Sequence, residues 1–340
     1  RSPQFCSMGG TSSSLRLRTA FSLRRDGGVS RKILVLGCMG AGKSTLCRIL
    51  AKAANAPAPP SRLYKHTIEN NLLEAFKALF ELARRYGIST DKFRNDLDIL
   101  LDFRHREDLH ANAVEAMKRL SRTTIYVEVT QKDRTRILEL PYNINYFMQN
   151  SDRILSRTFD PTEADVMSCY AQTVGTNFQS VRLGPARYEL LELPGHHIFR
   201  RSWREFFADT NVVIFVIDLS DLLRPQFYNG GHLQDKVRMV LRSIVTHQAL
   251  KDTPFILLFN KRDLLEECGA GFYFQQLGPS IRTWENAEKW YIDQCTTVIP
   301  PTNRVYTHSL ALTKKPDLNT TILDTLSQIF KANQNSMEAE

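Results

Sequence analysis

The sequence predicts an α/β fold with a mostly parallel sheet and, inserted into it, an all-helical domain. Residues 33–36 form an aliphatic run, which is followed by a glycine-rich loop and by an apolar helical stretch from Leu46. A second apolar run, at 254–259, leads directly into a polar loop. Lys43 and Thr173 lie 130 positions apart, whereas one crossover helix needs only about 10 to 15 residues. A folded unit must therefore lie between the first strand and the rest of the sheet.

The composition indicates a globular protein. The chain has 340 residues, of which 42% are hydrophobic and 24% charged, enough for one large or two modest cores. No apolar run approaches the roughly 18 to 20 residues that a membrane-spanning helix needs. The 10% of aromatic residues and several Val, Ile, Leu and Phe runs can bury enough surface to offset chain entropy. A membrane-spanning bundle and a mainly disordered chain are both excluded.

The positive charge is concentrated near the amino-terminal end. The formal net charge is +9, and residues 1–32 contain seven Lys or Arg against one Asp, so the rest of the chain carries +3. This distribution argues against nucleic-acid binding spread over the fold and favours a basic tail that meets an acidic surface. The six cysteines show neither CxxC pairing nor zinc-ligand spacing, which favours a reducing, cytosolic compartment.

Residues 1–28 are predicted to be a basic tail, because Ser, Gly and Arg dominate and apolar positions are scattered. Positions 8–13, Met-Gly-Gly-Thr-Ser-Ser, match an N-myristoylation pattern with Gly9 as the lipidated residue if residues 1–7 are a cloning remnant. One acyl chain together with nearby arginines would hold the chain at the cytoplasmic face of the plasma membrane. A solvated basic linker on a cytoplasmic protein is the alternative.

The loop at 37–45, Gly-Cys-Met-Gly-Ala-Gly-Lys-Ser-Thr, predicts a nucleoside triphosphate site. Glycines let successive backbone N–H groups converge on phosphate oxygens, and the following helix presents its positive end to the same anion. Lys43 is expected to reach the β and γ phosphates, and the Ser44 hydroxyl to bind Mg²⁺. The predicted nucleotide-binding residues of this loop are Gly37, Gly40, Ala41, Gly42, Lys43, Ser44 and Thr45.

The loop at 260–263, Asn-Lys-Arg-Asp, predicts that the base is guanine. A carboxylate at the end of a parallel strand can accept from guanine N1–H and N2–H₂, whereas adenine has no donor there. Asp263 is thus the predicted guanine reader, Asn260 ties the loops together, and the stem of Lys261 lies along the ring. Alone, the motif also fits an ordinary turn after a strand. Together with the phosphate loop, whose Lys43 lies 217 positions before Asn260, the motif becomes a specific indication of a guanine nucleotide site.

Two further stretches predict contacts to the metal and the terminal phosphate. The alternating run 188–195 ends with Glu192 and, three positions on, Gly195. In guanine-nucleotide switches such an acid holds a water of the metal, and such a glycine N–H senses the γ phosphate. The end of a surface hairpin is the alternative interpretation. Thr173, in a Thr-x-Gly with Gly175, is predicted to bring a second hydroxyl to Mg²⁺.

Residues 62–150 predict an all-helical unit without recognisable chemistry, because their apolar residues recur at helical spacing. The repeating positions are Ile68, Leu72, Leu73, Phe76, Leu79, Phe80 and Ala83, then Leu97, Leu100 and Leu101, and later Val114, Met117 and Leu120. A proline-rich stretch at 57–60 marks the hinge into this unit. The predicted domains are the sheet domain, at 29–58 and 171–340, and the inserted helical domain with its hinge, at 59–170.

In order and spacing, these motifs resemble those of the α subunit of a heterotrimeric G protein, a Ras-like P-loop GTPase with an inserted helical domain. The resemblance also rests on Ser-Asp-Arg-Ile at 151–154, Phe-Asp-Pro-Thr-Glu-Ala-Asp-Val at 159–166 and Tyr-Thr-His at 306–308, and it covers about residues 29–330. It implies that Ser151 and Asp152 line the nucleotide cleft and that backbone around Ala311 contacts the guanine oxygen. It further implies two switches, at 164–178 and 192–209, and binding of GTP and GDP with Mg²⁺.

The resemblance implies partners as well: a Gβγ dimer, a receptor or other exchange factor, an RGS-type activator and an effector. The stretch 199–207 resembles the helix by which the family meets partners, with amphipathic core packing as the alternative. The end of the chain, Ser-Met-Glu-Ala-Glu, is unlike the ends that engage receptors, and 9–31 is short for the helix that docks βγ. Nucleic acid is not among the expected partners.

The sequence departs from the family pattern where GTP is hydrolysed. Tyr170 stands where the family supplies an arginine, and a phenol cannot place a permanent positive charge on the transferring phosphoryl group. His196 stands where a glutamine orients the attacking water, and Met39 and Gly40 replace a small glycine and an acid of the phosphate loop. With Lys43, Tyr170 and His196 as the catalytic positions, we expect tight binding of GTP and GDP with slow hydrolysis.

Three other functions compete with this interpretation. A scaffold with a single persistent nucleotide-bound state would follow if hydrolysis were lost altogether. A P-loop ATPase or kinase conflicts with Asp263, because adenine has no donor for that carboxylate. Nucleic-acid binding has only the basic tail in its favour.

Overall fold

The computed structural model describes residues 30–56, 60–102, 110–132, 134–171, 173, 175–183, 186–224, 232–268, 274–314 and 318–338. The predicted basic tail, including Gly9, lies outside these residues. None of the helices in the described part of the chain combines the length and the apolar character that crossing a membrane requires.

The described residues form one six-stranded sheet with the order β2-β3-β1-β4-β5-β6. Its strands are β1 (Ser30–Gly37), β2 (Asn177–Leu183), β3 (Ala186–Glu192), β4 (Val212–Asp218), β5 (Phe255–Asn260) and β6 (Val305–Ser309). β2 runs antiparallel to β3, and the other neighbouring strands pair in parallel. The predicted mostly parallel α/β sheet is confirmed, and its two apolar runs fall in β1 and β5.

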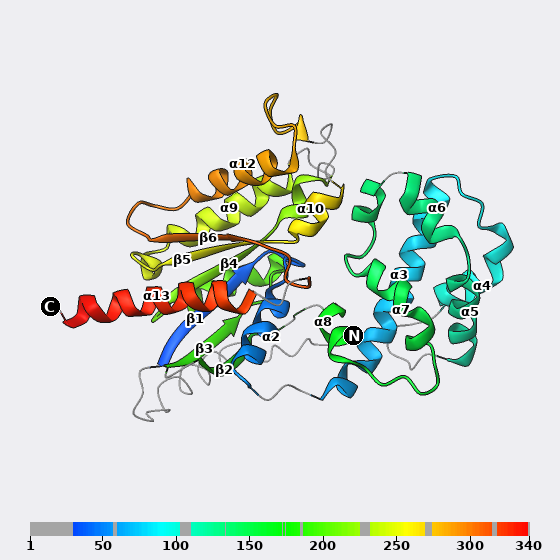
Figure 1. Cartoon of the computed structure of the whole chain (residues 1–340), viewed down its shortest axis with the longest axis horizontal. Helices are drawn as coiled ribbons and strands as arrows, with labels where there is room; N and C mark the ends of the chain where they lie inside the picture. The colour runs from blue at the N-terminus through cyan, green and yellow to red at the C-terminus, as the bar shows by residue number, and fades with distance from the viewer. Residues whose placement is uncertain are drawn as a thin grey trace, which may run out of the picture.

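Alternating side chains of the strands fill a core on each face of the sheet. Along β4, Val213, Phe215 and Ile217 belong to one core and the residues between them to the other, because successive side chains of a strand point to opposite faces. The first core is covered by η4 (His197–Phe206), α9 (Leu233–Val245), α10 (Arg262–Cys268) and α12 (Trp284–Thr296), the second by α2 (Lys43–Ala53) and α13 (Leu318–Glu338). Figure 1 shows the sheet between these helices. Because helices cover both faces of the sheet, we expect a ligand site in the loops at the carboxyl ends of the strands.

Between α2 and α8 the described chain is helical and lies beside the sheet domain as a separate unit (Figure 1). Its elements are η1 (Ser61–Tyr64), α3 (Lys65–Arg85), η2 (Asp91–Phe93), α4 (Arg94–Asp102), α5 (Ala111–Ser121), α6 (Ile125–Lys132), η3 (Arg134–Glu139), α7 (Ile144–Ile154) and α8 (Glu163–Ser168). They pack around their own core, which contains Phe76, Phe80 and Phe147. This unit corresponds to the inserted helices that the sequence predicts.

The apolar positions predicted for this unit are mostly buried. All seven positions between 68 and 83 lie on the buried face of α3, each at most 2% exposed. The prediction for Leu101 is wrong, because this side chain is 63% exposed while Leu100 is fully buried. Adjacent residues of a helix point about 100° apart, and α4 turns its Leu100 side towards the core and its Leu101 side towards solvent.

The helical unit returns to the sheet through α8. Thr162 and Asp165 form a capping box at the start of this helix. Arg153 of α7 donates to both oxygens of Asp165, at 2.6 and 3.0 Å. Burial alone raises the pKa of Asp165, but the hydrogen bonds from Arg153, Thr162 and Tyr146 outweigh burial and hold this pKa at about 2. The ionised carboxylate therefore fixes α8, where the predicted first switch at 164–178 begins, to the helical unit.

Candidate functional site

The glycine-rich loop joins β1 to α2 at the carboxyl end of β1. Gly37, Gly40 and Gly42 have φ angles of 144°, 77° and 107°, a left-handed range that favours glycine. α2 begins at Lys43, so the N–H groups of its first turn belong to the residues predicted to bind phosphate. This backbone arrangement suits an anion.

Lys43 is buried beneath this loop, with 6% of its surface exposed. Its ammonium group donates to the Cys38 carbonyl at 3.0 Å. Burial lowers the pKa of Lys43, and the carboxylate of Glu192 opposes that shift. A buried ammonium group is costly unless it is paired, so Lys43 fits the phosphate contact that the sequence predicts.

The three residues predicted to serve the metal lie together beside Lys43. Ser44 Oγ donates to Glu192 Oε1, and Thr173 Oγ1 lies 3.3 Å from Ser44 Oγ and 3.4 Å from Glu192 Oε1. Asn177 Nδ2 donates to the other carboxylate oxygen, Oε2, at 3.3 Å. Two hydroxyls and a carboxylate are the hard oxygen donors that Mg²⁺ prefers. The donor set fits the metal, and the individual roles stay predictions.

Gly195, three residues after β3, packs against the phosphate loop. Its carbonyl accepts from Arg200 Nε and Nη2, both at 3.2 Å, and Arg200 Nη2 also lies 3.5 Å from Cys38 Sγ. A Cβ at position 195 would lie 2.5 Å from Lys43 Nζ and 2.7 Å from the carbonyl carbon and oxygen of Cys38. The predicted second switch thus touches the phosphate loop where a side chain does not fit.

We expect Gly195→Ala to lower the free energy of unfolding by about 1–3 kcal/mol, because the backbone of Cys38 must move to admit a methyl group. Urea unfolding measures this change. Gly175→Ala is the matched control, because nothing lies within 4 Å of a Cβ placed at position 175. It should stay within about 0.5 kcal/mol of the parent chain. Equal stability of the two variants would contradict the packing described for Gly195.

Asn260 connects the phosphate loop with two loops on the other side of β4. Its side-chain Nδ2 donates to the Ala41 carbonyl at 2.8 Å, and its Oδ1 accepts from the Leu312 backbone N–H at 3.0 Å. Ala311, predicted to lie near the guanine oxygen, is buried directly before Leu312. The structure therefore brings together the phosphate loop, residues 260–263 and the loop after β6, which are far apart in sequence.

Asp263 is 8% exposed, and its two carboxylate oxygens differ in their surroundings. Oδ2 lies 3.1 Å from Lys314 Nζ. Oδ1 is buried and has no hydrogen-bond partner among the described residues. Buried polar atoms are normally hydrogen-bonded, so Oδ1 is suited to accept from a ligand that brings N–H donors.

Lys261 makes an ion pair that the sequence analysis did not predict. Its Nζ donates to Asp218 Oδ2 at 2.6 Å, and both side chains are buried. Asp218 ends β4 directly beside Asn260 in the sheet, and Ser220 donates to its other oxygen. Burial raises the pKa of Asp218, but Lys261 and Arg224 outweigh burial and lower it. The backbone of Lys261 is left-handed, with φ of 64°.

A second acid, Asp221, is buried in η5 (Leu219–Leu222). Burial, reinforced by the charge of Asp218, raises the pKa of Asp221 to about 7, although Arg224 lies 3.6 Å away and opposes the shift. Between the ordinary carboxyl pKa of about 4 and pH 7, the folded chain holds a proton that the unfolded chain releases. We therefore expect the unfolding free energy to fall as pH rises through this window.

Asp221→Asn tests this dependence, because the amide cannot ionise. Between pH 5 and pH 8 the melting temperature of the variant should fall less than that of the parent chain, and at pH 8 the variant should be the more stable of the two. Asp98→Asn, at an exposed position of α4, is the control and should follow the parent curve. Parallel curves for the parent and Asp221→Asn would contradict the expected titration.

Tyr170 and His196, two of the three residues predicted for hydrolysis, form hydrogen bonds to residues outside the phosphate loop. Tyr170 is 49% exposed, and the side chain of Asn71 binds both its backbone N–H and its carbonyl. His196 Nδ1 accepts from the Ile198 N–H at 3.4 Å, so its ring caps η4. The ring of His197 lies 4.3 Å away. The structure thus brings neither side chain into a described hydrogen bond with the phosphate loop.

Ser151 and Asp152 lie in α7 of the helical unit. Ser151 is buried and donates its hydroxyl to the Met148 carbonyl within its own helix, at 3.0 Å, whereas Asp152 is exposed. Their place in the nucleotide cleft stays a prediction.

The sequence analysis missed several residues that hold the site. Asp218 carried a signal, since it ends a buried apolar strand at the edge where Asn260 ends the next one. Asn71 and Arg200 carried none, because each acts on a segment about 100 or more positions away, at Tyr170 and Cys38. Only the tertiary structure identifies them, because each contact joins segments that are far apart in the sequence.

Comparison with known proteins agrees with this geometry. The chain matches the model of the G-protein alpha subunit family over residues 16–330. It is 24% identical over 329 residues to the guanine nucleotide-binding protein alpha-14 subunit of Caenorhabditis briggsae. This match covers 89% of this chain and 81% of that protein. It is 22% identical over 293 residues to the alpha-12 subunit of Dictyostelium discoideum, with 82% of each chain covered. The G(o) subunit alpha of Locusta migratoria is 24% identical over 246 residues, with 69% of each chain covered.

Proposed function

Because the chain belongs to the family of G-protein alpha subunits, we propose that it is a signalling switch that binds GDP and GTP with Mg²⁺ and hydrolyses GTP slowly. The observation that carries this proposal is the hydrogen bond from Asn260 Nδ2 to the Ala41 carbonyl. It joins the loop suited to phosphate with the loop suited to guanine across the sheet. A nucleotide of the right length would contact both.

Within this proposal each end of the nucleotide has its own residues. The backbone of 37–45 and the Lys43 ammonium bind the phosphates. Ser44 and Thr173 would hold Mg²⁺, Glu192 would hold one of its waters, and the metal would neutralise phosphate charge. Asp263 accepts from guanine N1–H and N2–H₂, and its partnerless Oδ1 supports this assignment.

Slow hydrolysis follows from the residues at the γ-phosphate end. The reaction needs an attacking water, a broken bond between the γ phosphorus and the bridging oxygen, and positive charge on the transferring group. Tyr170 supplies no such charge, and the ring of His196 is engaged by its own turn. A partner that brings an arginine would accelerate the reaction, and a chain that never hydrolyses would instead be a scaffold in one state. Protease protection of residues 192–209 that differs between GDP and GTP would exclude the scaffold.

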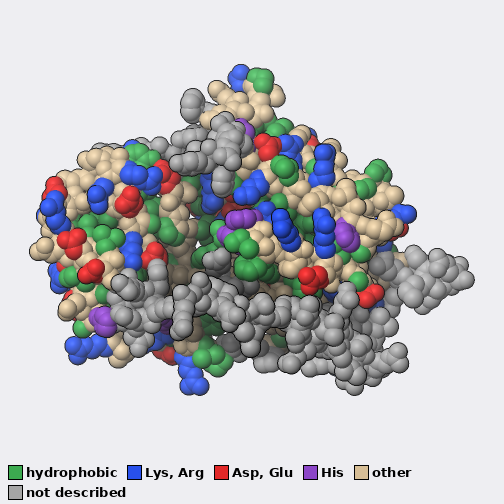
Figure 2. All heavy atoms as spheres, turned by 180° about the vertical axis from the view of Figure 1, so that it is seen from behind, with side chains coloured by type: hydrophobic (Ala, Val, Ile, Leu, Met, Phe, Trp, Pro, Cys, Tyr) green, Lys and Arg blue, Asp and Glu red, His purple; other side chains and the backbone are tan. Residues whose placement is uncertain are grey.

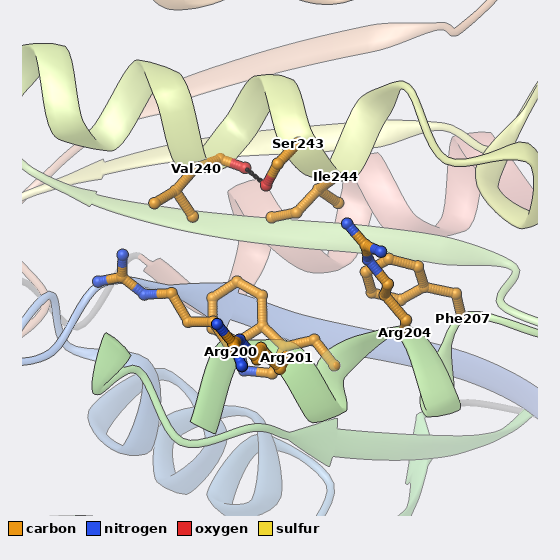
Figure 3. Close-up of a pocket in the computed structure, with 8 residues that line it drawn as sticks. Arg200, Arg201, Arg204, Phe207, Val240, Ser243 and Ile244 are labelled. Carbon is orange, nitrogen blue, oxygen red and sulfur yellow. Dashed lines mark hydrogen bonds between the residues drawn. The ribbon is translucent and has the colours of Figure 1, made fainter. Parts of the chain in front are cut away.

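The groove between η4 and α9 is the proposed surface for a protein partner. Its volume is about 420 Å³. Figure 3 shows Arg200, Arg201 and Arg204 on η4, and Phe207 directly after it, below α9, where Val240 and Ile244 lie. The groove combines apolar side chains with the exposed Arg201 and Arg204, a lining that suits an apolar segment flanked by acidic residues. We assign this surface to an effector, an RGS-type activator or a Gβγ dimer.

The same proposal includes attachment to a membrane and leaves out nucleic acid. Membrane attachment through Gly9 rests on the sequence pattern alone, since Gly9 lies outside the described residues. Nucleic acid is not proposed as a partner. Figure 2 shows Lys and Arg side chains interspersed with Asp and Glu over both units on the face that it displays, whereas nucleic-acid surfaces concentrate positive charge.

Nucleotide identification tests the function directly. The purified full chain is denatured, and the released nucleotide is separated by chromatography. We expect close to one GDP or GTP per chain, and added GTP should compete for the site where ATP does not. Removal of Mg²⁺ with a chelator should accelerate nucleotide loss, because the phosphates lose a counter-charge. A chain that is empty and indifferent to added guanosine phosphates would overturn the proposal.

A further inference from the structure

One side chain of the helical unit contacts both loops assigned to the base. Tyr142, between η3 and α7, has its ring centroid 4.5 Å from Lys261 Nζ and its hydroxyl 3.1 Å from Thr313 Oγ1. We propose that Tyr142 closes the base end of the nucleotide cleft and slows the release of bound guanine nucleotide. This inference rests on the proposed function and adds the residue that controls release.

The ring of Tyr142 contacts the ammonium group of Lys261, which is fixed in place. Lys261 is 4% exposed and is held by Asp218 at 2.6 Å. An ammonium group within about 6 Å of an aromatic centroid is attracted by the ring face, more strongly when it is shielded from water. Because Lys261 is locked by its ion pair, it cannot follow Tyr142 when that side chain withdraws.

The hydroxyl of Tyr142 reaches the second base loop. Thr313 follows Leu312, whose N–H binds Asn260. Burial raises the pKa of Tyr142, and the nearby charge of Asp263 adds to this effect. The phenol therefore stays protonated at neutral pH and remains available as a hydrogen-bond donor. A single residue thus bridges the loop at 260–263 and the loop after β6.

The segment that carries Tyr142 packs on both units. Leu138 belongs to the core of the sheet domain, on the face covered by α9 and α12. Leu140 and Ile144 belong to the core of the helical unit, and Ile137 contacts both cores. A movement of the helical unit away from the sheet therefore pulls on Tyr142 and separates it from the base loops.

Release of a nucleotide from between the two units requires such an opening. Contacts that exist only in the closed state lower the rate of opening, so their loss appears in the dissociation rate more than in the association rate. Removing the ring contact and the hydroxyl bond together should raise the dissociation rate about 10- to 100-fold. Removing the hydroxyl alone should raise it about threefold to tenfold.

The test uses the full chain loaded with a fluorescent N-methylanthraniloyl GDP and chased with excess unlabelled GDP. Tyr142→Ala should release the probe about 10- to 100-fold faster than the parent chain, and Tyr142→Phe should fall between them. Tyr142→Phe should have no further effect in Thr313→Val, because both changes remove the same hydrogen bond. Tyr126→Phe is the matched control, since its hydroxyl bonds to Asn145 inside the helical unit, and its release rate should equal that of the parent.

Amide hydrogen exchange without added nucleotide gives a second readout. Residues 260–263 and 310–314 should exchange faster in Tyr142→Ala and not in Tyr126→Phe. A release rate for Tyr142→Ala within twofold of the parent, in a chain that binds GDP normally, would overturn this inference alone. A parent chain that does not bind GDP would overturn the proposed function instead.

Discussion

Replacing Asp263 with Asn should weaken GDP binding by about 10²- to 10³-fold. The carboxylate is proposed to accept two N–H donors of guanine, and hydrogen bonds to a charged partner are each worth about 1.5–3 kcal/mol. The amide of asparagine keeps one acceptor and turns an N–H₂ group towards a guanine donor. Isothermal titration of nucleotide-stripped chain measures the loss as a ratio of dissociation constants.

The same variant provides its own positive control. Xanthosine diphosphate carries a carbonyl at C2, which can accept from the new amide, so Asp263→Asn should bind it more tightly than the parent does. Asp293→Asn, in α12, should leave GDP affinity unchanged. Unaltered GDP affinity in Asp263→Asn would show that Asp263 does not read the base.

Tyr170→Arg should raise the single-turnover rate of GTP hydrolysis about 10²-fold or more. An arginine at the transferring phosphoryl group is worth about 10³ to 10⁵ in rate where it is fully positioned. The backbone at position 170 is held on both sides by Asn71, so the new side chain starts from a fixed point. Because Tyr170 is 49% exposed, the exchange leaves no cavity in the core. Release of γ-phosphate from preloaded GTP measures the rate.

Tyr170→Phe is the control that changes the side chain at position 170 without adding a positive charge. It removes the hydroxyl and adds no charge, so hydrolysis should stay within about twofold of the parent rate. GDP affinity should be the same in all three chains, because the change concerns the transition state. A parent chain that already hydrolyses GTP as fast as Tyr170→Arg would refute the interpretation of Tyr170 as a lost catalytic position.

The elements with strong local patterns were predictable from the sequence. The strand, glycine loop and helix at 30–53 follow from an aliphatic run, the left-handed conformations that glycine allows, and an apolar periodicity. The buried face of α3 follows from spacing in the same way. Leu101 was mispredicted because the apolar pattern offers two neighbouring leucines, and only the packing of α4 decides that Leu100 faces the core and Leu101 faces solvent.

The placement of candidate site residues was predictable where each residue belongs to a loop with its own sequence pattern. Ser44, Thr173 and Glu192 were expected at one metal and do lie together. The contact of Asn260 with the phosphate loop was also expected, and the bond to Ala41 provides it. The partner of Lys261 was not predicted, because Asp218 belongs to a different strand. That the two side chains meet becomes clear only when the order of the strands places β4 beside β5.

By itself the sequence determined the chemical groups and the backbone that presents them: a glycine loop before a helix, and an acid after a buried strand. These depend on neighbours within a few residues, whose conformational preferences are local. Only the tertiary structure decided that Tyr142 faces Lys261, that Asn71 holds Tyr170 and that Arg200 reaches Cys38. Those contacts join segments about 100 or more positions apart, and their formation depends on how the helical unit and the switch pack against the sheet.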